Sequence, residues 1–249
     1  MKEEKSSFCV IIKLGDNNMP AARIHEVIAL KVNKEYKCDE TLLRIGTISP
    51  DSWRNSEILK NNNGKNITHF INTDIKDVKV YDYVRFFNKY KDDIYNPFYF
   101  GYLIHLMVDQ YWKTKIDPKY CFKEDGVDKC RLRDGSIVVD EHHFSYYEDE
   151  KIQRMLAKKY NLDLLPADPN TIPNFECSIE ELDLNGLFGP SGTISFVNSR
   201  LMPNGNDEES TLYDFDDIDK YTDETASFVE QELSKLLSLL QTEDRLHKM

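Results

Sequence analysis

The sequence predicts an all-α fold, a multi-helix bundle. Three observations favour it: apolar residues recur at helical spacing, prolines stand where helices would begin or end, and residues 98–112 are apolar on nearly all faces. The 249 residues suffice for a sizeable core, and 40% hydrophobic with 12% aromatic residues is too much for a disordered chain. We expect a single helical domain over residues 1–249, in which residues 1–18 could be an extension.

The first predicted helix follows Pro20, a favourable first-turn residue, and its apolar face repeats at helical spacing as far as Val32. The most apolar helix should begin after Asn96-Pro97 and end near Ile116, where Asp117-Pro118 would stop it. Four further helices are expected over the ranges Asp39–Gly46, Asp77–Lys91, Asp140–Tyr160 and Thr222–Arg245.

The helical pattern fails between Asn161 and Ser210, where five of the nine prolines lie. We expect a long irregular segment near residues 161–210, which would be either a long connection or a lid. Within it, the pattern suggests only a short helix at Ser178–Leu184 and a strand at Thr193–Val197.

The charge balance and the cysteines narrow the class of protein. Asp and Glu number 44 against 32 Lys and Arg, a net charge of −12 without a basic cluster, so duplex nucleic acid is not an expected partner. The five cysteines are scattered and form no C-x-x-C pair, which excludes a zinc ribbon and suits a reducing cytosol. No apolar stretch is long enough for a transmembrane segment, so we expect a soluble, cytoplasmic protein.

The helix at 98–112 contains two polar residues whose position is informative. His105 and Asp109 are four residues apart and share one face, and Gly101 leaves room one turn earlier on that face. A buried carboxylate without a partner is costly, so both side chains must meet something polar. A local hydrogen bond between them is one explanation, and a metal ion is the other.

Three further residues favour the metal ion. His25 lies on the inward face of the first predicted helix, Asp51 follows Ser49-Pro50, and His69 stands between large apolar neighbours. Alone, each has a simpler explanation: a histidine bonded to a carbonyl, a helix-capping aspartate, a core histidine. Together with His105 and Asp109 they form a ligand set that suits Zn²⁺, with Mn²⁺ or Fe as possible ions.

The order and surroundings of these residues resemble one known family. The matching stretches are His25 on the first helix, Pro50-Asp51, Thr68-His69-Phe70 and the run from Phe100 through Gly101 and His105 to Asp109. Over about residues 19–112 they resemble the zinc-dependent phospholipase C and S1/P1 nuclease family, in its short cytoplasmic bacterial branch. The resemblance implies a helical bundle around up to three metal ions, and hydrolysis of phosphodiester or phosphomonoester bonds.

The chain departs from that family after the fifth ligand. Lys115 stands where a further histidine would be sought, and His142 and His143 are followed four residues later by Tyr146 and Tyr147 rather than by glutamate. We therefore expect one or two ions, and we leave open whether His142 or His143 is a ligand.

The expected function is that of a metal-dependent hydrolase acting on a phosphoester-containing substrate, in which metal-activated water attacks phosphorus. His25, His69, His105, Asp51 and Asp109 would be the ligands, and Asp51 could also orient the water. The alternative is a structural or regulatory metal-binding protein without turnover. An HD-type phosphohydrolase would need an adjacent His-Asp pair, which the sequence lacks.

Overall fold

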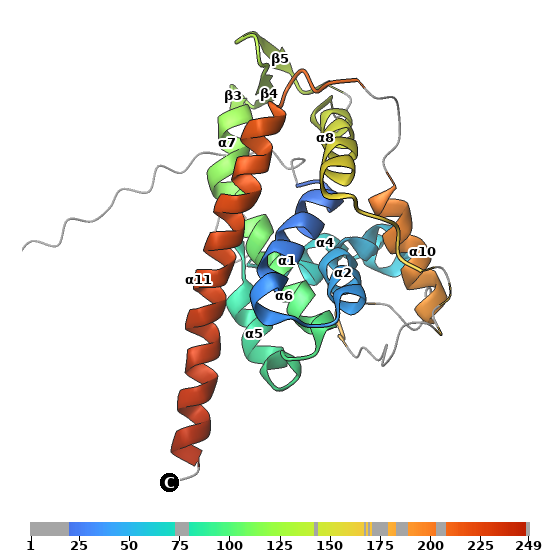
Figure 1. Cartoon of the computed structure of the whole chain (residues 1–249). Coiled ribbons are helices and arrows are strands. Elements are labelled where there is room, and N and C mark those ends of the chain that lie inside the picture. The colour runs from blue at the N-terminus through green and yellow to red at the C-terminus, as the bar shows by residue number, and fades with distance from the viewer. Residues whose placement is uncertain are drawn as a thin grey trace, which may run out of the picture.

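The computed structural model describes residues 20–72, 80–141, 144–166, 168, 170, 179–182, 189–202 and 208–247, and it is mostly helical, as predicted (Figure 1). The helical elements are α1 (Ala22–Tyr36), α2 (Glu40–Ile48), η1 (Ser49–Asn55), α3 (Glu57–Asn61), α4 (Gly64–Thr68), α5 (Tyr83–Tyr90), η2 (Lys91–Asp93), α6 (Pro97–Tyr111), η3 (Trp112–Ile116), α7 (Asp117–Tyr120), α8 (Phe144–Tyr160), α10 (Gly189–Leu201) and α11 (Phe215–His247). The strands are β1 (Ile71–Asn72), β2 (Val80–Tyr81), β3 (Cys121–Glu124), β4 (Val127–Arg131) and β5 (Ile137–Val139).

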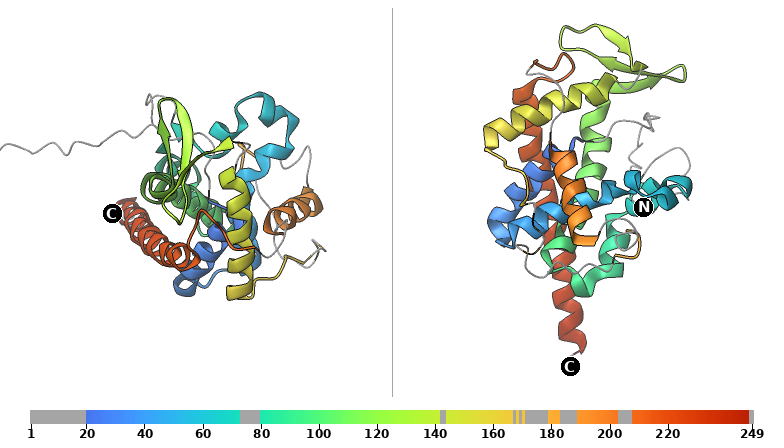
Figure 2. Two further views of the ribbon diagram at one scale, coloured as in Figure 1. Left: turned by 90° about the horizontal axis from the view of Figure 1, so that it is seen from above. Right: turned by 90° about the vertical axis from the view of Figure 1, so that its right-hand side faces the viewer.

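Helix α6 is the centre of the bundle. The Asn96 side chain caps it by accepting from the backbone N–H of Phe98 at 3.0 Å, and Pro97 occupies its first turn. Every residue from Phe98 to Asp109 is buried, because α1, α2, α5 and α11 pack around this helix. Helix α11 runs along one side of the molecule, and its C-terminal end extends past the other helices (Figures 1 and 2).

Two glycines bring α2 and α6 into backbone contact. A Cβ added at Gly46 would lie 2.0 Å from the carbonyl oxygen of Phe98, and one added at Gly101 would lie 2.2 Å from that of Leu43. The room that Gly101 leaves is therefore taken up by the backbone of α2. This approach places the last turn of α2, with the carbonyl of Thr47, against the face of α6 that carries His105.

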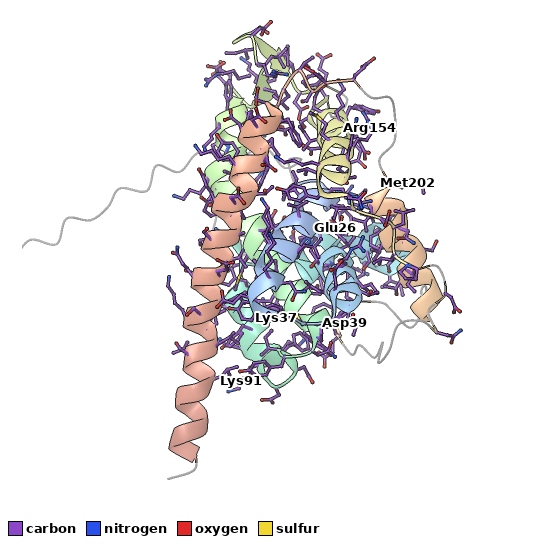
Figure 3. The ribbon with its side chains drawn as sticks, in the orientation of Figure 1. Glu26, Lys37, Asp39, Lys91, Arg154 and Met202 are labelled. Atoms are coloured by element: carbon purple, nitrogen blue, oxygen red, sulfur yellow. The ribbon has the colours of Figure 1, made fainter. Side chains whose placement is uncertain are left out.

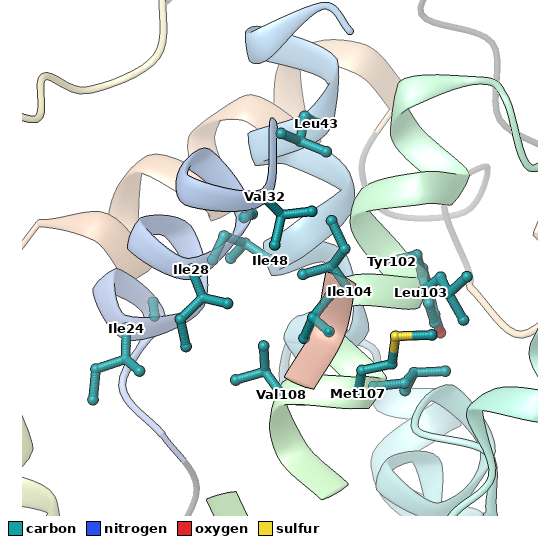
Figure 4. Close-up of a cluster of buried hydrophobic side chains, with 14 of the residues drawn as sticks. Ile24, Ile28, Val32, Leu43, Ile48, Tyr102, Leu103, Ile104, Met107 and Val108 are labelled. Atoms are coloured by element: carbon teal, nitrogen blue, oxygen red, sulfur yellow. The ribbon is translucent and has the colours of Figure 1, made fainter. Parts of the chain in front are cut away.

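The main apolar core lies where α1, α2 and α6 meet. Ile28 and Val32 of α1 face Ile48 of α2 and Ile104 and Val108 of α6, all at most 1% exposed (Figure 4). Burial of such side chains stabilises each by about 1.5–3 kcal/mol relative to exposure. The core fixes the relative positions of the three helices that also carry the polar site.

A second buried network joins α1 to α2 through charge. Glu26 is fully buried and lies inside the bundle (Figure 3). It accepts from Arg23 Nη1 at 2.5 Å and from Arg44 Nε at 2.6 Å. Arg44 also donates to the carbonyl oxygen of Asp163. Because both arginines are buried, this carboxylate is their necessary counter-charge.

The small three-stranded sheet at one end of the molecule is not among the sequence predictions. Strands β3, β4 and β5 form an antiparallel meander, with Cys121 opposite Cys130 and Cys130 opposite Val138 (Figure 2). The tight turn between β3 and β4 is Asp125-Gly126, with φ of 52° and 81°. An Asp-Gly pair between two short strands is a hairpin signal that the sequence did contain.

Several predicted bounds are corrected by the structure. The predicted strand Thr193–Val197 is wrong, because these residues lie inside helix α10. The segment 161–210 is thus not irregular throughout. Of the predicted helix Ser178–Leu184, the described residues Ile179–Leu182 form a turn, and the others lie outside the described residues. Helix α11 begins at Phe215 instead of Thr222, since the Asp214 side chain accepts from the backbone N–H of Asp216 at 2.9 Å and caps its start.

Helices α2, α5 and α8 differ from the predicted ranges by smaller amounts. Helix α2 continues to Ile48, past the predicted end near Gly46. The predicted range Asp77–Lys91 contains β2 before α5, and α8 begins at Phe144. No helix in the described part of the chain is both long and apolar enough to cross a membrane.

Candidate metal centre

The structure brings all five predicted site residues together. His25 comes from α1, Asp51 from η1, and His69 follows the last residue of α4, while His105 and Asp109 lie one turn apart on α6. Each is at most 2% exposed. Four separate elements therefore direct polar side chains to one buried point.

The tautomer of His105 is fixed by the backbone of α2. Its Nδ1 lies 2.7 Å from the carbonyl oxygen of Thr47. A carbonyl oxygen can only accept, so Nδ1 carries the proton and donates. In a neutral ring the lone pair is then on Nε2, which faces the centre of the site.

His69 is oriented in the same way by α4. Its Nδ1 lies 3.1 Å from the carbonyl oxygen of Lys65 and 2.9 Å from Thr68 Oγ1. The Thr68 hydroxyl lies 3.1 Å from the carbonyl oxygen of Gly64, to which it donates. Nδ1 of His69 therefore donates as well, which leaves the lone pair on Nε2.

The atoms that converge on the centre are lone-pair acceptors. Nε2 of His69 lies 3.3 Å from Nε2 of His105, and both are 3.6 Å from Asp109 Oδ2. Asp51 Oδ1 is 3.6 Å from His69 Nε2, and Asp109 Oδ1 is 3.3 Å from His25 Nε2. Both oxygens of Asp109, Oδ1 of Asp51 and both ring nitrogens of His25 are buried without a hydrogen-bond partner in the described protein. Such an arrangement requires a positive charge between the atoms.

His25 and His105 are stacked face to face, with ring centroids 4.0 Å apart and planes 8° from parallel. Burial and the neighbouring His105 lower the pKa of His25 to about 4. Burial also lowers the pKa of His69. Both rings are thus neutral near neutral pH, which is the state in which histidine binds metals.

Without a metal ion, a proton would have to supply the positive charge. Burial lowers the pKa of His105, but the charge of Asp109 more than offsets this and raises it. Burial likewise raises the pKa of Asp109, yet His105 and His25 hold it far below its usual range. A single imidazolium could share its Nε2 proton with His69, but it would offset only one of the two buried carboxylates.

These residues could hold a metal ion in two overlapping groups. His25, His105 and Asp109 offer ligand atoms within 4.8 Å of one another, and so do Asp51, His69 and His105. Asp109 contacts histidines of both groups through different oxygens. These residues could therefore hold one ion or two.

Residues beyond the five are also placed by the structure. Lys115 is exposed and supplies nothing to the site, while His142 and His143 lie outside the described residues. Lys113 and Asp117 form a buried pair at 3.5 Å on the following turns, and burial raises the pKa of Asp117 to about 7. The carbonyls of Thr47 and Lys65 carry no side-chain signal, so the sequence could not identify them as supports of the histidines.

Comparison of the chain with family models, with curated proteins and with solved structures finds no match.

Proposed function

We propose that this protein is a zinc-dependent hydrolase of phosphoester bonds. One observation carries the proposal: His69 Nε2, His105 Nε2 and Asp109 Oδ2 form a buried triangle of lone-pair atoms with edges of 3.3, 3.6 and 3.6 Å. The ring protons of both histidines are committed to backbone carbonyls on the opposite nitrogen. Outer hydrogen bonds of this kind orient histidine ligands in metal sites.

The spacing favours zinc over a hard octahedral ion. Four ligands about 2.0–2.2 Å from a tetrahedral zinc ion are separated by about 3.3–3.6 Å. Octahedral ligands about 2.0–2.1 Å from magnesium would lie only about 2.8–3.0 Å apart. The edges of the triangle, and the 3.6 Å between Asp51 Oδ1 and His69 Nε2, fall in the tetrahedral range. Mn²⁺ or Fe remain compatible with the donor types.

Charge supports a divalent ion as well. Asp51 and Asp109 bring two carboxylates into a site where neither is more than 2% exposed. One divalent cation neutralises both at the centre of the site, whereas a proton on His105 neutralises one and leaves Asp51 to the charge of Arg200. Burying an uncompensated charge costs several kcal/mol, so the metal-bound form is the better balanced state.

In this proposal His69, His105 and Asp109 would hold the first ion and leave its fourth position to water. His25 with the other Asp109 oxygen offers a place for a second ion. A bound zinc ion lowers the pKa of water and polarises a phosphoryl oxygen, which is the chemistry of phosphoester hydrolysis. Asp51, whose Oδ1 lies 3.6 Å from His69 Nε2, would accept a hydrogen bond from that water and orient it. The phosphoester class is supported by the resemblance of the Thr68-His69-Phe70 and Gly101-to-Asp109 motifs to zinc-dependent phospholipase C and S1/P1 nuclease enzymes.

Activity is tested with nitrophenyl phosphate mono- and diesters, a phospholipid and single-stranded nucleic acid. Turnover should disappear with a chelator and return when zinc or manganese is added. A matched pair of variants, His69→Ala and the exposed control Lys115→Ala, separates the site from contaminating activity, since only the first should lose turnover. If both variants kept the turnover of the parent, the assignment of the activity to this site would be contradicted.

The depth of the site favours a second candidate, a structural ion without turnover. His25, His69 and His105 are fully buried, and structural zinc sites are closed whereas catalytic sites keep a position open to water. A protein that binds zinc with a large rise in melting temperature, yet hydrolyses none of these substrates, would establish this alternative.

A further inference from the structure

Arg200 stands at the end of α10, in a turn that is held firmly in place. Helix α10 packs against α2 and η1. Arg23 Nε donates to the carbonyl oxygen of Leu201 at 3.0 Å, just before Met202, which Figure 3 labels at the end of this helix. One turn earlier, the side chain of Asn198 bonds the backbone of Leu165 twice, at 2.7 and 3.0 Å. The position of Arg200 is thus fixed from both sides.

The guanidinium of Arg200 has donors that the described protein does not use. Its Nη1 donates to the hydroxyl oxygen of Tyr146 at 3.2 Å, while its Nε is buried without a hydrogen-bond partner. Arg200 takes part in no ion pair among the described residues. Burial by itself lowers the pKa of Arg200. Nearby acidic groups, Asp51 foremost, more than offset this effect, so the pKa is raised. A partly unsatisfied arginine therefore stands on a helix that packs against η1, the element that carries the candidate ligand Asp51.

The turn that carries Asp51 adds donors of the same kind. Trp53 Nε1 and Arg54 Nε, two and three residues after Asp51, are buried and have no hydrogen-bond partner. The Arg54 guanidinium lies 5.3 Å from the centre of the Trp53 ring, which holds both side chains together. The unsatisfied atoms of Trp53, Arg54 and Arg200 are all N–H donors. Buried donors need an acceptor, which the oxygens of an anion can supply.

We propose that Arg200 binds a non-bridging oxygen of the substrate's phosphate group beside the metal centre, with the Tyr146 hydroxyl as a second donor. This inference rests on the proposed phosphoester hydrolase function. Arginine suits the role because its planar fork matches phosphate oxygens. Since Arg200 donates to the oxygen of Tyr146, the phenol hydrogen is left to donate to the same anion.

The test uses inorganic phosphate and the full-length protein loaded with Co²⁺, whose visible spectrum reports on ligands near the ion. Phosphate is titrated into the parent, Arg200→Gln, Arg200→Lys and the control Arg131→Gln, an exposed arginine of β4. Calorimetry on the zinc-loaded proteins gives the phosphate affinity, and metal analysis gives the ion content of each. Because Arg200→Gln could fold poorly, Arg200→Lys keeps the charge and gives a second measurement.

We expect unchanged metal content in all four proteins and a phosphate affinity about 10-fold or more weaker in Arg200→Gln, as for loss of a charge-assisted hydrogen bond. The phosphate affinity of Arg200→Lys should lie between those of the parent and Arg200→Gln, and the affinity of Arg131→Gln should match that of the parent. Equal phosphate affinity in the parent and Arg200→Gln at full metal content would overturn this inference and leave the metal centre standing. A parent protein that takes up no metal would instead overturn the proposed function, and this inference with it.

Discussion

Nε2 of His69 lies 3.3 Å from Nε2 of His105, and the other ring nitrogen of each histidine donates to a backbone carbonyl, of Lys65 and Thr47 respectively. Two neutral imidazoles cannot satisfy each other in this arrangement, because both present lone pairs. Either a metal ion or one extra proton must lie between them. A metal ion and a proton at this point have different consequences for metal content and for the pH dependence of stability.

Asp109→Asn should lower metal affinity by at least about 10–100-fold, since loss of even an outer-shell partner has that effect. If the site instead holds a proton and no metal ion, asparagine would keep a hydrogen bond to His25 or His105, and the metal content would not change. The measurement is ion stoichiometry after dialysis. Asp117→Asn is the matched control, because it alters another buried carboxylate, 3.5 Å from Lys113, that is not among the five site residues. Equal loss in both variants would argue against a specific role for Asp109.

Gly101→Ala should destabilise the protein and weaken metal binding together. The new methyl group would lie 2.2 Å from the carbonyl oxygen of Leu43 and 2.9 Å from the backbone nitrogen of Thr47, so α2 must shift. Overpacking of this kind costs about 1–3 kcal/mol or more. Because the Thr47 carbonyl orients His105, a shift of α2 should also misplace that ligand.

Thermal unfolding with and without zinc measures both effects in Gly101→Ala. Ser234→Ala, at an exposed position of α11, should change neither stability nor metal affinity appreciably. Parent-like stability in Gly101→Ala would mean that the close contact between α2 and α6 is not required.

Glu26→Gln should lower the free energy of unfolding by about 3–5 kcal/mol, because Arg23 and Arg44 would lose their buried counter-charge. Glu26 is the immediate neighbour of His25 but contacts no site residue in this network, so metal stoichiometry should stay unchanged. Chemical denaturation and metal analysis check the two parts. Glu35→Gln, an exposed change on the same helix, is the control.

Above about pH 6.5, the contribution of His105 to the pH dependence of stability should differ in sign between the metal-free and zinc-loaded proteins. The pKa of His25 is lowered from 6.5 to about 4, so the unfolded chain binds a proton that the folded protein does not, and stability falls as the pH drops from about 6.5 to 4. The pKa of His105 is raised, so its contribution is present below pH 6.5 and is lost as the pH rises through the folded value.

The combined contribution of His25 and His105 to the stability of the metal-free protein should therefore be greatest near pH 6.5. Zinc replaces the proton on His105, and the zinc-loaded protein should become more stable as the pH rises across the same range. Melting temperatures from pH 4 to 8.5, with and without zinc, provide the comparison. If the plots of melting temperature against pH ran parallel with and without zinc, zinc would not replace the proton on His105.

Much of the helical fold can be predicted from local sequence. The site residues can be predicted because they are polar residues at positions where the pattern predicts burial. His105 and Asp109 were predictable because polar residues in a helix that is apolar on nearly all faces must meet a partner. Thr193–Val197 was misassigned as a strand because a short apolar run fits a strand or a buried helix equally well, and packing of α10 against α2 decides it.

Other parts depend on contacts that the sequence does not encode locally. The supporting carbonyls of Thr47 and Lys65 belong to the backbone, whose role is independent of residue type. Arg200 comes from α10, which is distant in sequence from the η1 turn that carries Asp51, and the two elements meet only in the folded chain. The β3–β4 hairpin is different, because Asp125-Gly126 could have revealed it.

The metal content of the protein purified without a nickel column decides whether the five buried residues form a metal site. Elemental analysis should find about one to two divalent ions per chain, zinc foremost, and His105→Ala should lose them. Added zinc should raise the melting temperature of chelator-treated parent protein but not of His105→Ala. Metal-free parent protein whose melting temperature does not change on addition of zinc, manganese or iron would contradict the account.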